Sequence, residues 1–393
     1  MPPAGGMQCP HRVRRWLTIL IIAVLTAVIA VLTWLMPKPH YWALDFNNNL
    51  WAPANLLMHG QSPYYTDSFF DNTETIWFNA VWFPPVIGLL GPLGWLDMQL
   101  AADLWFLLGF GLIIAIVWAT QRHERVAIPP FAVLIVALSP PLLPHLQYGQ
   151  FGLLAAFLLL VAARFVAKQR YLLAGLLAAV GLSKPQLALL ALPGLWLASA
   201  RLGKRRGGLI LPAGTFLGLA LSTLPLWIIY PNWIPDFLRA LERNLPWLQP
   251  TLFTVLPMWL GPAGLAIAIL VALGAFGLNL WLWWKYPPEE VLPWSLGLTA
   301  VAAPYIWTWD FVLFLPLICR SLLQQRTWIA RVTWAVGYAL CWGLILGLRA
   351  FTDDSDCWHF WMPWFFFLLV LAGHTLESRF SRAGRQPLLR HAR

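Results

Sequence analysis

Four polar residues stand at breaks between apolar runs and carry side chains that could do chemistry: Asp45, Gln150, Lys184 and Asp310. A carboxylate that is partly removed from water becomes more basic and can accept a proton from a hydroxyl group. An ammonium group at membrane depth is costly unless an anion shares its site. Asp45 is therefore the candidate general base, and Lys184 is the candidate ligand for an anionic group.

Each of these residues also has an ordinary structural interpretation. Asp45 would serve equally well as the cap of a helix over residues 50–59, and Lys184 would serve as a lysine that extends to the membrane interface. Gln150 would stabilise a hairpin between two helices. For Asp310, two interpretations are equally good: a contact to a ligand, and a structural partner for Lys184.

A second basic pair lies in the segment Asp236-Phe237-Leu238-Arg239-Ala240-Leu241-Glu242-Arg243. This segment predicts a short amphipathic helix with Arg239 and Arg243 four residues apart on one face, where they could hold an anionic headgroup. The alternative is that both arginines pair with Asp236 and Glu242 or reach lipid phosphates.

The amino-acid composition indicates the class of fold that positions these residues. Of the 393 residues, 60% are hydrophobic and only 11% are charged, and the mean hydropathy is +0.66. These values exceed those of soluble globular chains and predict an all-α, polytopic transmembrane helix bundle. The net charge of +10 comes mostly from short basic clusters between apolar runs, which indicates membrane topology and excludes a nucleic-acid partner.

Apolar runs predict about twelve spans with the N-terminus and the C-terminus in the cytoplasm. The predicted spans are residues 16–36, 100–120, 129–146, 151–167, 171–183, 186–200, 208–230, 262–284, 291–303, 310–323, 328–349 and 358–376. We interpret residues 1–393 as a single membrane domain. It consists of a retained signal anchor over residues 16–36, a large outer loop over 37–99, a bundle over 100–376 and a basic cytoplasmic tail over 377–393.

If residues 81–96 crossed the membrane fully, the predicted side of every later loop would be reversed. Their prolines favour a partly inserted or tilted outer segment instead.

This predicted topology brings four polar residues to the outer side of the membrane: Asp45, Gln150, Lys184 and Asp310. A shared cavity there would let them meet. We predict no metal site, because Asp67, Asp71 and Glu74 have no ligand-like spacing.

Several short motifs, taken in order, resemble glycosyltransferase family 87. They are Leu44-Asp45-Phe46 followed by Pro63-Tyr64-Tyr65, then Phe83-Pro84-Pro85, Gly149-Gln150, Ser183-Lys184-Pro185 and Trp307-Thr308-Trp309-Asp310. The resemblance covers about residues 40–320. It implies the GT-C membrane fold and a mannosyltransferase that uses a polyprenyl-phosphate sugar, and it names no cofactor.

The resemblance also implies roles for the residues. Asp45 would be the general base of an inverting displacement at a glycolipid or glycan hydroxyl on the outer face of the cell membrane. Lys184, with Arg239 and Arg243 as second choices, would bind the donor phosphate. Gln150, Asp310 and Trp309 would contact the sugar or the acceptor, although Trp309 is also typical of an interfacial anchor. The competing function is a transporter or lipid flippase, which would also have many spans and intramembrane charges.

Overall fold

The computed structural model describes residues 43–64, 82–124, 126, 129–242, 247–352 and 355–383, and every regular element in these ranges is a helix. The first part of the chain contains α2 (Leu44–Phe46), η1 (Asn47–Trp51), α3 (Ala52–Met58), α4 (Pro84–Leu90), η2 (Gly91–Trp95), α5 (Met98–Glu124), α6 (Pro130–Ala137), α7 (Leu142–Tyr148), α8 (Gly152–Ala167), α9 (Tyr171–Gly181) and η3 (Pro185–Ala188). The second part contains α10 (Ala191–Ile229), α11 (Trp233–Glu242), α12 (Leu252–Leu260), α13 (Pro262–Lys285), α14 (Pro288–Ala302), η4 (Thr308–Phe314), α15 (Leu315–Gln324), α16 (Trp328–Phe351), η5 (Asp356–His359) and α17 (Met362–Ala383).

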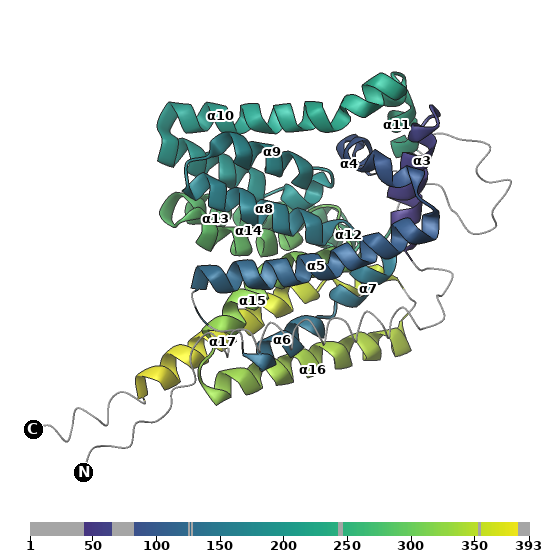
Figure 1. Ribbon diagram of the computed structural model, residues 1–393. Coiled ribbons are helices and arrows are strands. Elements are labelled where there is room, and N and C mark those ends of the chain that lie inside the picture. Colours follow the sequence, from purple (N-terminus) through teal and green to yellow (C-terminus); the bar gives the residue numbers. More distant parts are fainter. Residues whose placement is uncertain are drawn as a thin grey trace, which may run out of the picture.

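The bundle has two distinct ends. Helices α3, α4 and α11 lie at the right-hand end in Figure 1, and α17 runs out toward the lower left. At the first end, which we call the Asp45 end, the backbone N–H of Ala43 donates to the carbonyl of Gln147 at 2.7 Å. At the opposite, Arg320 end, Arg320 Nε lies 2.8 Å from Glu124 Oε1. Consecutive long helices run between these two ends.

The helices pack in a continuous series across the bundle. Helix α10 packs on α9, α9 on α8, and α8 on both α5 and α14; α15 then joins α5 to α17, which packs on α16. Close contact of α9 and α10 depends on glycine, because a Cβ on Gly175 would lie 2.3 Å from the carbonyl oxygen of Leu211. Small residues of this kind let helix backbones approach closely in membranes.

Helix α10 reverses direction at Lys204, whose backbone is non-helical with φ 51° and ψ −141°. The indole N–H of Trp196 donates to the carbonyl of Gly208 at 2.8 Å. Twelve residues of straight helix would separate these positions by about 18 Å, so the two halves of α10 must lie side by side. Two antiparallel helical segments therefore lie where separate spans were predicted at residues 186–200 and 208–230.

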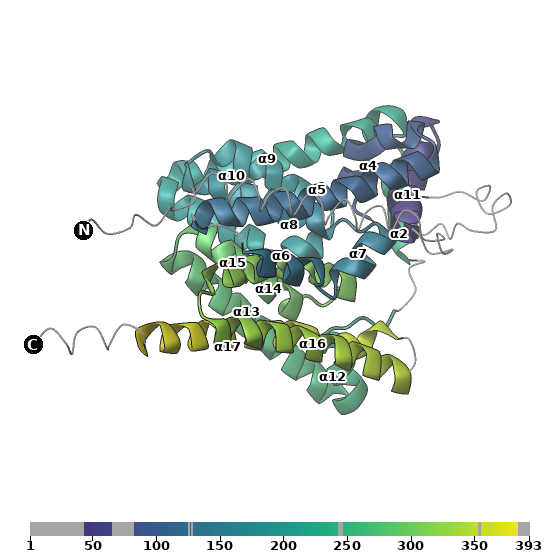
Figure 2. The same ribbon diagram turned by 60° about the horizontal axis from the view of Figure 1, so that its bottom comes forward.

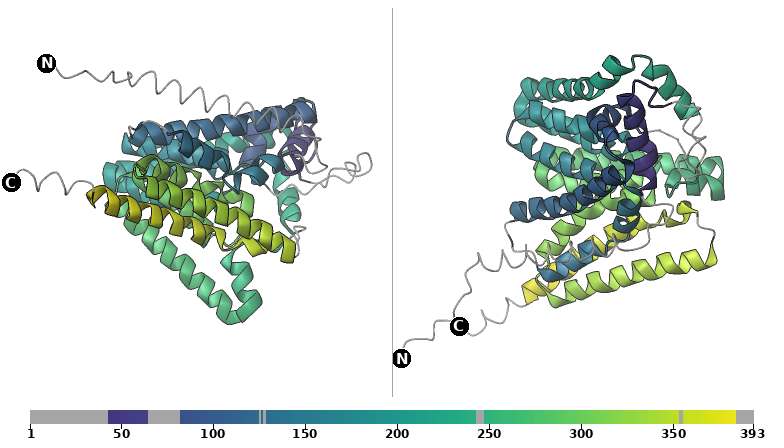
Figure 3. Two further views of the ribbon diagram at one scale, coloured as in Figure 1. Left: turned by 90° about the horizontal axis from the view of Figure 1, so that it is seen from below. Right: turned by 45° about the vertical axis from the view of Figure 1, so that its right-hand side comes forward.

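Five helices in the described ranges are long and apolar enough to cross a membrane, or up to six if the pair α6 and α7, bent by 51°, forms one span. The predicted count of about twelve is not confirmed. Several predicted spans correspond to shorter helices, namely α8, α9, α14 and α15, which fall below the ~20 residues that cross a bilayer unaided. Figure 3 shows α12 and α13 as a hairpin projecting from one side of the bundle.

Within the segment predicted at residues 81–96, the structure has the two short helices α4 and η2, and neither is long enough to cross. The predicted signal anchor at residues 16–36 lies outside the described residues. So do the acidic residues Asp67, Asp71 and Glu74 of the outer loop, and the last part of the predicted tail. The final helix continues to Ala383, seven residues beyond the predicted end of its span.

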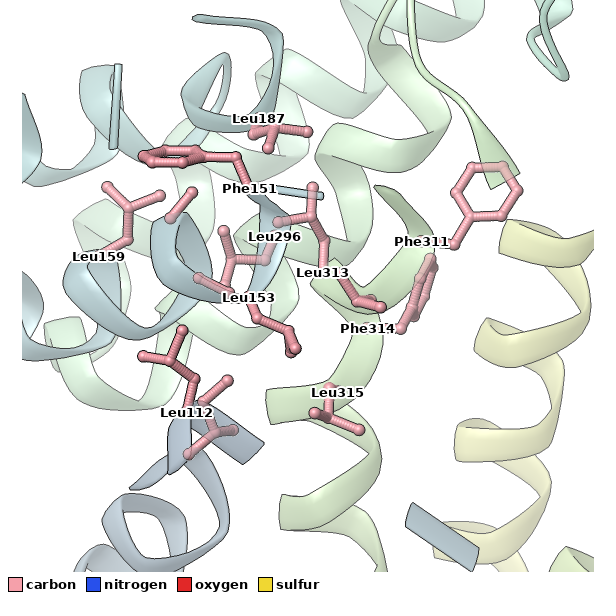
Figure 4. Close-up of a cluster of buried hydrophobic side chains, with 14 of the residues drawn as sticks. Leu112, Phe151, Leu153, Leu159, Leu187, Leu296, Phe311, Leu313, Phe314 and Leu315 are labelled. Carbon is pink, nitrogen blue, oxygen red and sulfur yellow. The ribbon is translucent and has the colours of Figure 1, made fainter. Parts of the chain in front are cut away.

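A buried apolar core lies beside the helix interruptions where the polar residues of the candidate site are found. Figure 4 shows Phe151, the residue before α8, and Leu153 of α8 close to Leu187, Leu296 and Leu313, and all five side chains are at most 1% exposed. Phe151 follows Gln150 directly, and Leu187 and Leu313 each come three residues after a charged residue of the candidate site. Burial of this core therefore fixes the backbone that carries Gln150, Lys184 and Asp310.

Candidate functional site

The four polar residues singled out in the sequence form one continuous hydrogen-bonded chain. The amide nitrogen of Gln150 donates to Asp45 Oδ2. The ammonium group of Lys184 donates to Gln150 Oε1 at 2.9 Å and to Asp310 Oδ1 at 2.7 Å. Asp310 is completely buried, Lys184 and Gln150 are nearly so, and Asp45 is half-buried. Asp45 is thus the most exposed member of this hydrogen-bonded chain.

Breaks in regular helix place all four side chains. Asp45 lies in α2, directly before the π-helical turn η1, a conformation that is often found at functional sites. Gly149 ends α7 with φ 70°, a left-handed conformation that glycine adopts without strain, and so turns the chain at Gln150. Lys184 lies between α9 and η3, and Asp310 lies within η4.

Two structural interpretations offered by the sequence are wrong. Asp45 is not a helix cap, because helix begins at Leu44 with Ala43 in the N-cap position, and the Asp45 carboxylate bonds to Gln150. Lys184 does not extend to the interface, because it is only 6% exposed and its amine is held by two partners. The interpretation of Asp310 as a partner for Lys184 is confirmed by their ion pair.

Burial makes the Asp45 carboxylate more basic. Desolvation raises the pKa of Asp45 to about 6, and the charge of Asp310 acts in the same direction. The positive charge of Lys184 and the hydrogen bond from Gln150 oppose this shift. Asp45 is therefore still ionised at neutral pH but is a stronger base than a solvated aspartate.

Two further residues belong to the site that sequence reasoning did not select. His145 Nδ1 lies 3.1 Å from the carbonyl oxygen of Trp309, and His145 Nε2 accepts from the backbone N–H of Leu153 at 3.3 Å. This pattern assigns the proton to Nδ1 and joins α7 to η4 and α8. Lys184 Nζ also lies 5.9 Å from the centre of the Trp82 ring, within cation–π range. The signal available in the sequence was the position of His145 in an apolar run, between Pro144 and Leu146.

The ring of Trp309 lies between two other aromatic rings. Trp307 stacks on it at 4.9 Å with an interplanar angle of 12°, and Tyr148 lies 5.0 Å away at 53°. The indole nitrogen of Trp309 is buried and has no hydrogen-bond partner in the described chain. Buried N–H groups are normally paired, so this unpaired donor is an exception among the described residues.

Arg239 is separate from the hydrogen-bonded chain that joins Asp45, Gln150, Lys184 and Asp310. Arg239 pairs with Asp236 at 3.3 Å and is 60% exposed, which confirms the structural alternative for this residue. Asp236 also accepts from Ser62 at 2.5 Å and from Tyr230 at 2.9 Å. Arg243 lies outside the described residues. No group of three or more His, Cys, Asp or Glu side chains in the described part of the chain has the arrangement of a metal site.

Fold and site together define a helical membrane protein with a half-buried base at one end of its bundle. Residues 81–316, more than half of the chain, match the family model of glycosyltransferase family 87. The chain therefore belongs to glycosyltransferase family 87 and is a membrane glycosyltransferase. Neither a curated protein nor a solved structure matches it. Gln150, Lys184 and Asp310 lie within the matched region, whereas Asp45 precedes it.

Proposed function

We propose that this glycosyltransferase has the GT-C fold and transfers a hexose, with mannose as the first candidate, from a polyprenyl-phosphate sugar to a hydroxyl acceptor. The acceptor is a glycolipid or glycan at the outer face of the cell membrane. One observation carries the proposal: a half-buried carboxylate, Asp45, is joined through Gln150 to a buried ammonium group. A base and a cation are the two groups that this transfer requires.

Asp45 acts as the general base. Its Oδ2 accepts from Gln150, while Oδ1 has no hydrogen-bond partner among the described residues. Oδ1 removes the proton from the acceptor hydroxyl as the acceptor oxygen forms its bond to the anomeric carbon and the bond to the phosphate oxygen breaks. A single base with direct displacement inverts the anomeric carbon.

Lys184 stabilises the departing polyprenyl phosphate. An ammonium group has three N–H donors, and Gln150 and Asp310 use two of them. The third donor is available for a phosphate oxygen, and the buried setting strengthens that contact. Arg239, in α11, and Arg243 are second candidates for the same phosphate. The cation of Lys184 serves without a metal cofactor, so we expect transfer to continue in the presence of EDTA.

Gln150, Asp310 and Trp309 orient the sugar or the acceptor. The Trp309 indole N–H is the buried donor without a partner, and a sugar hydroxyl or ring oxygen would accept from it. Asp310 Oδ2 receives only a long bond of 3.3 Å from the backbone N–H of Trp307. It therefore retains capacity to accept from a hydroxyl group.

The experiment is to incubate the purified protein with labelled polyprenyl-phosphate mannose and a cell-envelope lipid extract. A labelled product supports the transferase. Movement of the labelled donor across proteoliposomes without any product would favour the alternative, a transporter or flippase. The same assay with other polyprenyl-phosphate hexoses identifies the sugar.

A further inference from the structure

Asp356, in the connection between α16 and α17, reaches the helix that carries Asp310. Its Oδ2 accepts from the backbone N–H of Thr308 at 2.9 Å, and its Oδ1 accepts from the Thr308 hydroxyl at 2.5 Å. Thr308 is the first residue of η4, and Asp310 comes two residues later. Both oxygens of one carboxylate thus hold a single residue from a distant part of the chain.

The first turn of η4 depends on these contacts. The first N–H groups of a helix have no acceptor within the helix. Here two carboxylates supply acceptors, because Trp307 N–H donates to Asp310 Oδ2 at 3.3 Å while Thr308 N–H donates to Asp356. Moreover, η4 is a 3-10 helix of seven residues, and runs of more than three or four residues are uncommon because their hydrogen bonds are poor. A fixed starting point therefore determines where its side chains lie.

His359 holds Asp356 in turn. His359 Nδ1 lies 3.3 Å from the backbone oxygen of Asp356 and 3.6 Å from its Oδ1. The side chains of His359 and Asp356 are only 12% and 19% exposed. These contacts help to hold the Asp356 carboxylate beside Thr308.

We infer that Asp356 is a positioning residue for the transfer: by binding Thr308 with both oxygens, it fixes η4 so that Asp310 meets Lys184 with the observed geometry. The inference rests on the proposed function. It has a consequence for the whole chain, because Asp356 lies beyond the region that matches the family model. The last two helices, α16 and α17, are then required for a competent site.

Steady-state transfer by single and double variants tests this role. We expect Asp356→Asn to lower kcat by about 10- to 100-fold, as small displacements of reacting groups do, with little change in the KM for the donor. In the Asp310→Asn background the same substitution should have almost no further effect, because both changes disturb one arrangement. Independent losses that multiply would show that Asp356 acts elsewhere and would overturn the inference.

A hydroxyl series keeps the test decisive if Asp356→Asn does not fold. Thr308→Val removes the hydroxyl donor to Asp356, and Thr308→Ser retains it, so kcat should fall in the first variant and be rescued in the second. Glu242→Gln, an exposed carboxylate at the same end, is the control and should leave kcat unchanged. Wild-type kcat in both Asp356→Asn and Thr308→Val would overturn this inference and leave the proposed function standing. A wild-type protein without transfer would overturn the proposed function and this inference with it.

Discussion

Lys184 and Asp310 form an ion pair inside the bundle, with 2.7 Å between Nζ and Oδ1. The lysine side chain is 8% exposed and the aspartate is not exposed at all. A buried pair of this kind is costly to assemble, and removing one partner leaves an uncompensated charge. Under the proposed function, this costly pair serves the donor phosphate as well as the stability of the fold.

The first prediction concerns the stability of this pair. Lys184→Met should lower the free energy of unfolding by about 3–5 kcal/mol, because Asp310 loses its counter-ion in a buried setting. Arg239→Met is the matched control, since Arg239 is 60% exposed in its pair with Asp236 and exposed pairs contribute at most about 1 kcal/mol. Urea unfolding in detergent micelles measures both values. Equal losses in the two variants would contradict a buried, coupled pair.

The second prediction concerns pH. Since the pKa of Asp45 is raised to about 6 and the base must be ionised, kcat/KM should rise as pH increases through 6 and then reach a plateau. Gln150→Leu removes a contact that lowers the pKa, so its midpoint should move to higher pH. Asp310→Asn removes a like charge, so its midpoint should move to lower pH. Shifts of the same sign in both variants would contradict the assignment of the titration to Asp45.

The same shift sets the sign of the effect on stability. The folded pKa of about 6 lies above the ordinary value of 3.8, so between these values the folded chain retains a proton that the unfolded chain releases. The contribution of Asp45 to stability is therefore complete below pH 3.8 and is lost as pH rises through 6. Asp45→Asn should remove this part of the pH dependence.

The third prediction concerns orientation. From the basic clusters we predict that the Lys204 turn lies in the cytoplasm and that α11 lies outside. In variants without other accessible cysteines, an impermeant maleimide should label Glu242→Cys in intact cells. Lys204→Cys should be labelled only after the membrane is permeabilised. Both native positions are exposed. The reverse pattern would place the Asp45 end in the cytoplasm.

The fourth prediction concerns the reversal within α10. Lys204 has φ 51° and ψ −141°, a region that costs a non-glycine residue about 1–3 kcal/mol. Lys204→Gly should therefore raise the unfolding free energy. Arg205→Gly, in the helix that follows, should lower it by about 1 kcal/mol. A loss of stability at both positions would show that the turn carries no such strain.

Much of the bundle could be predicted because the length and spacing of the apolar runs indicate where long helices lie. The helices near residues 100–120, 262–284 and 328–349 were confirmed as α5, α13 and α16. Their alternation also predicted that Asp45, Gln150, Lys184 and Asp310 would reach the same end. A short helix such as α15 could not be distinguished from a full span, because burial inside the bundle also selects apolar residues.

The partners within the site could not be predicted in the same way. The contacts between Asp45 and Gln150, Lys184 and Asp310, and Thr308 and Asp356 join residues 105, 126 and 48 positions apart. No local periodicity records such pairings, which depend on how the helices pack. For the same reason the helix-cap interpretation of Asp45 and the interfacial interpretation of Lys184 were open in the sequence and were excluded only by three-dimensional contacts.

Transfer by Asp45→Asn protein is the most direct measurement of the central claim. Asparagine keeps the size of the side chain but cannot accept the proton, so sugar transfer from polyprenyl-phosphate mannose should be abolished while the unfolding transition stays intact. Glu242→Gln, an exposed change at the same end, should retain wild-type turnover. Turnover by folded Asp45→Asn at the wild-type rate would contradict the assignment of Asp45 as the general base.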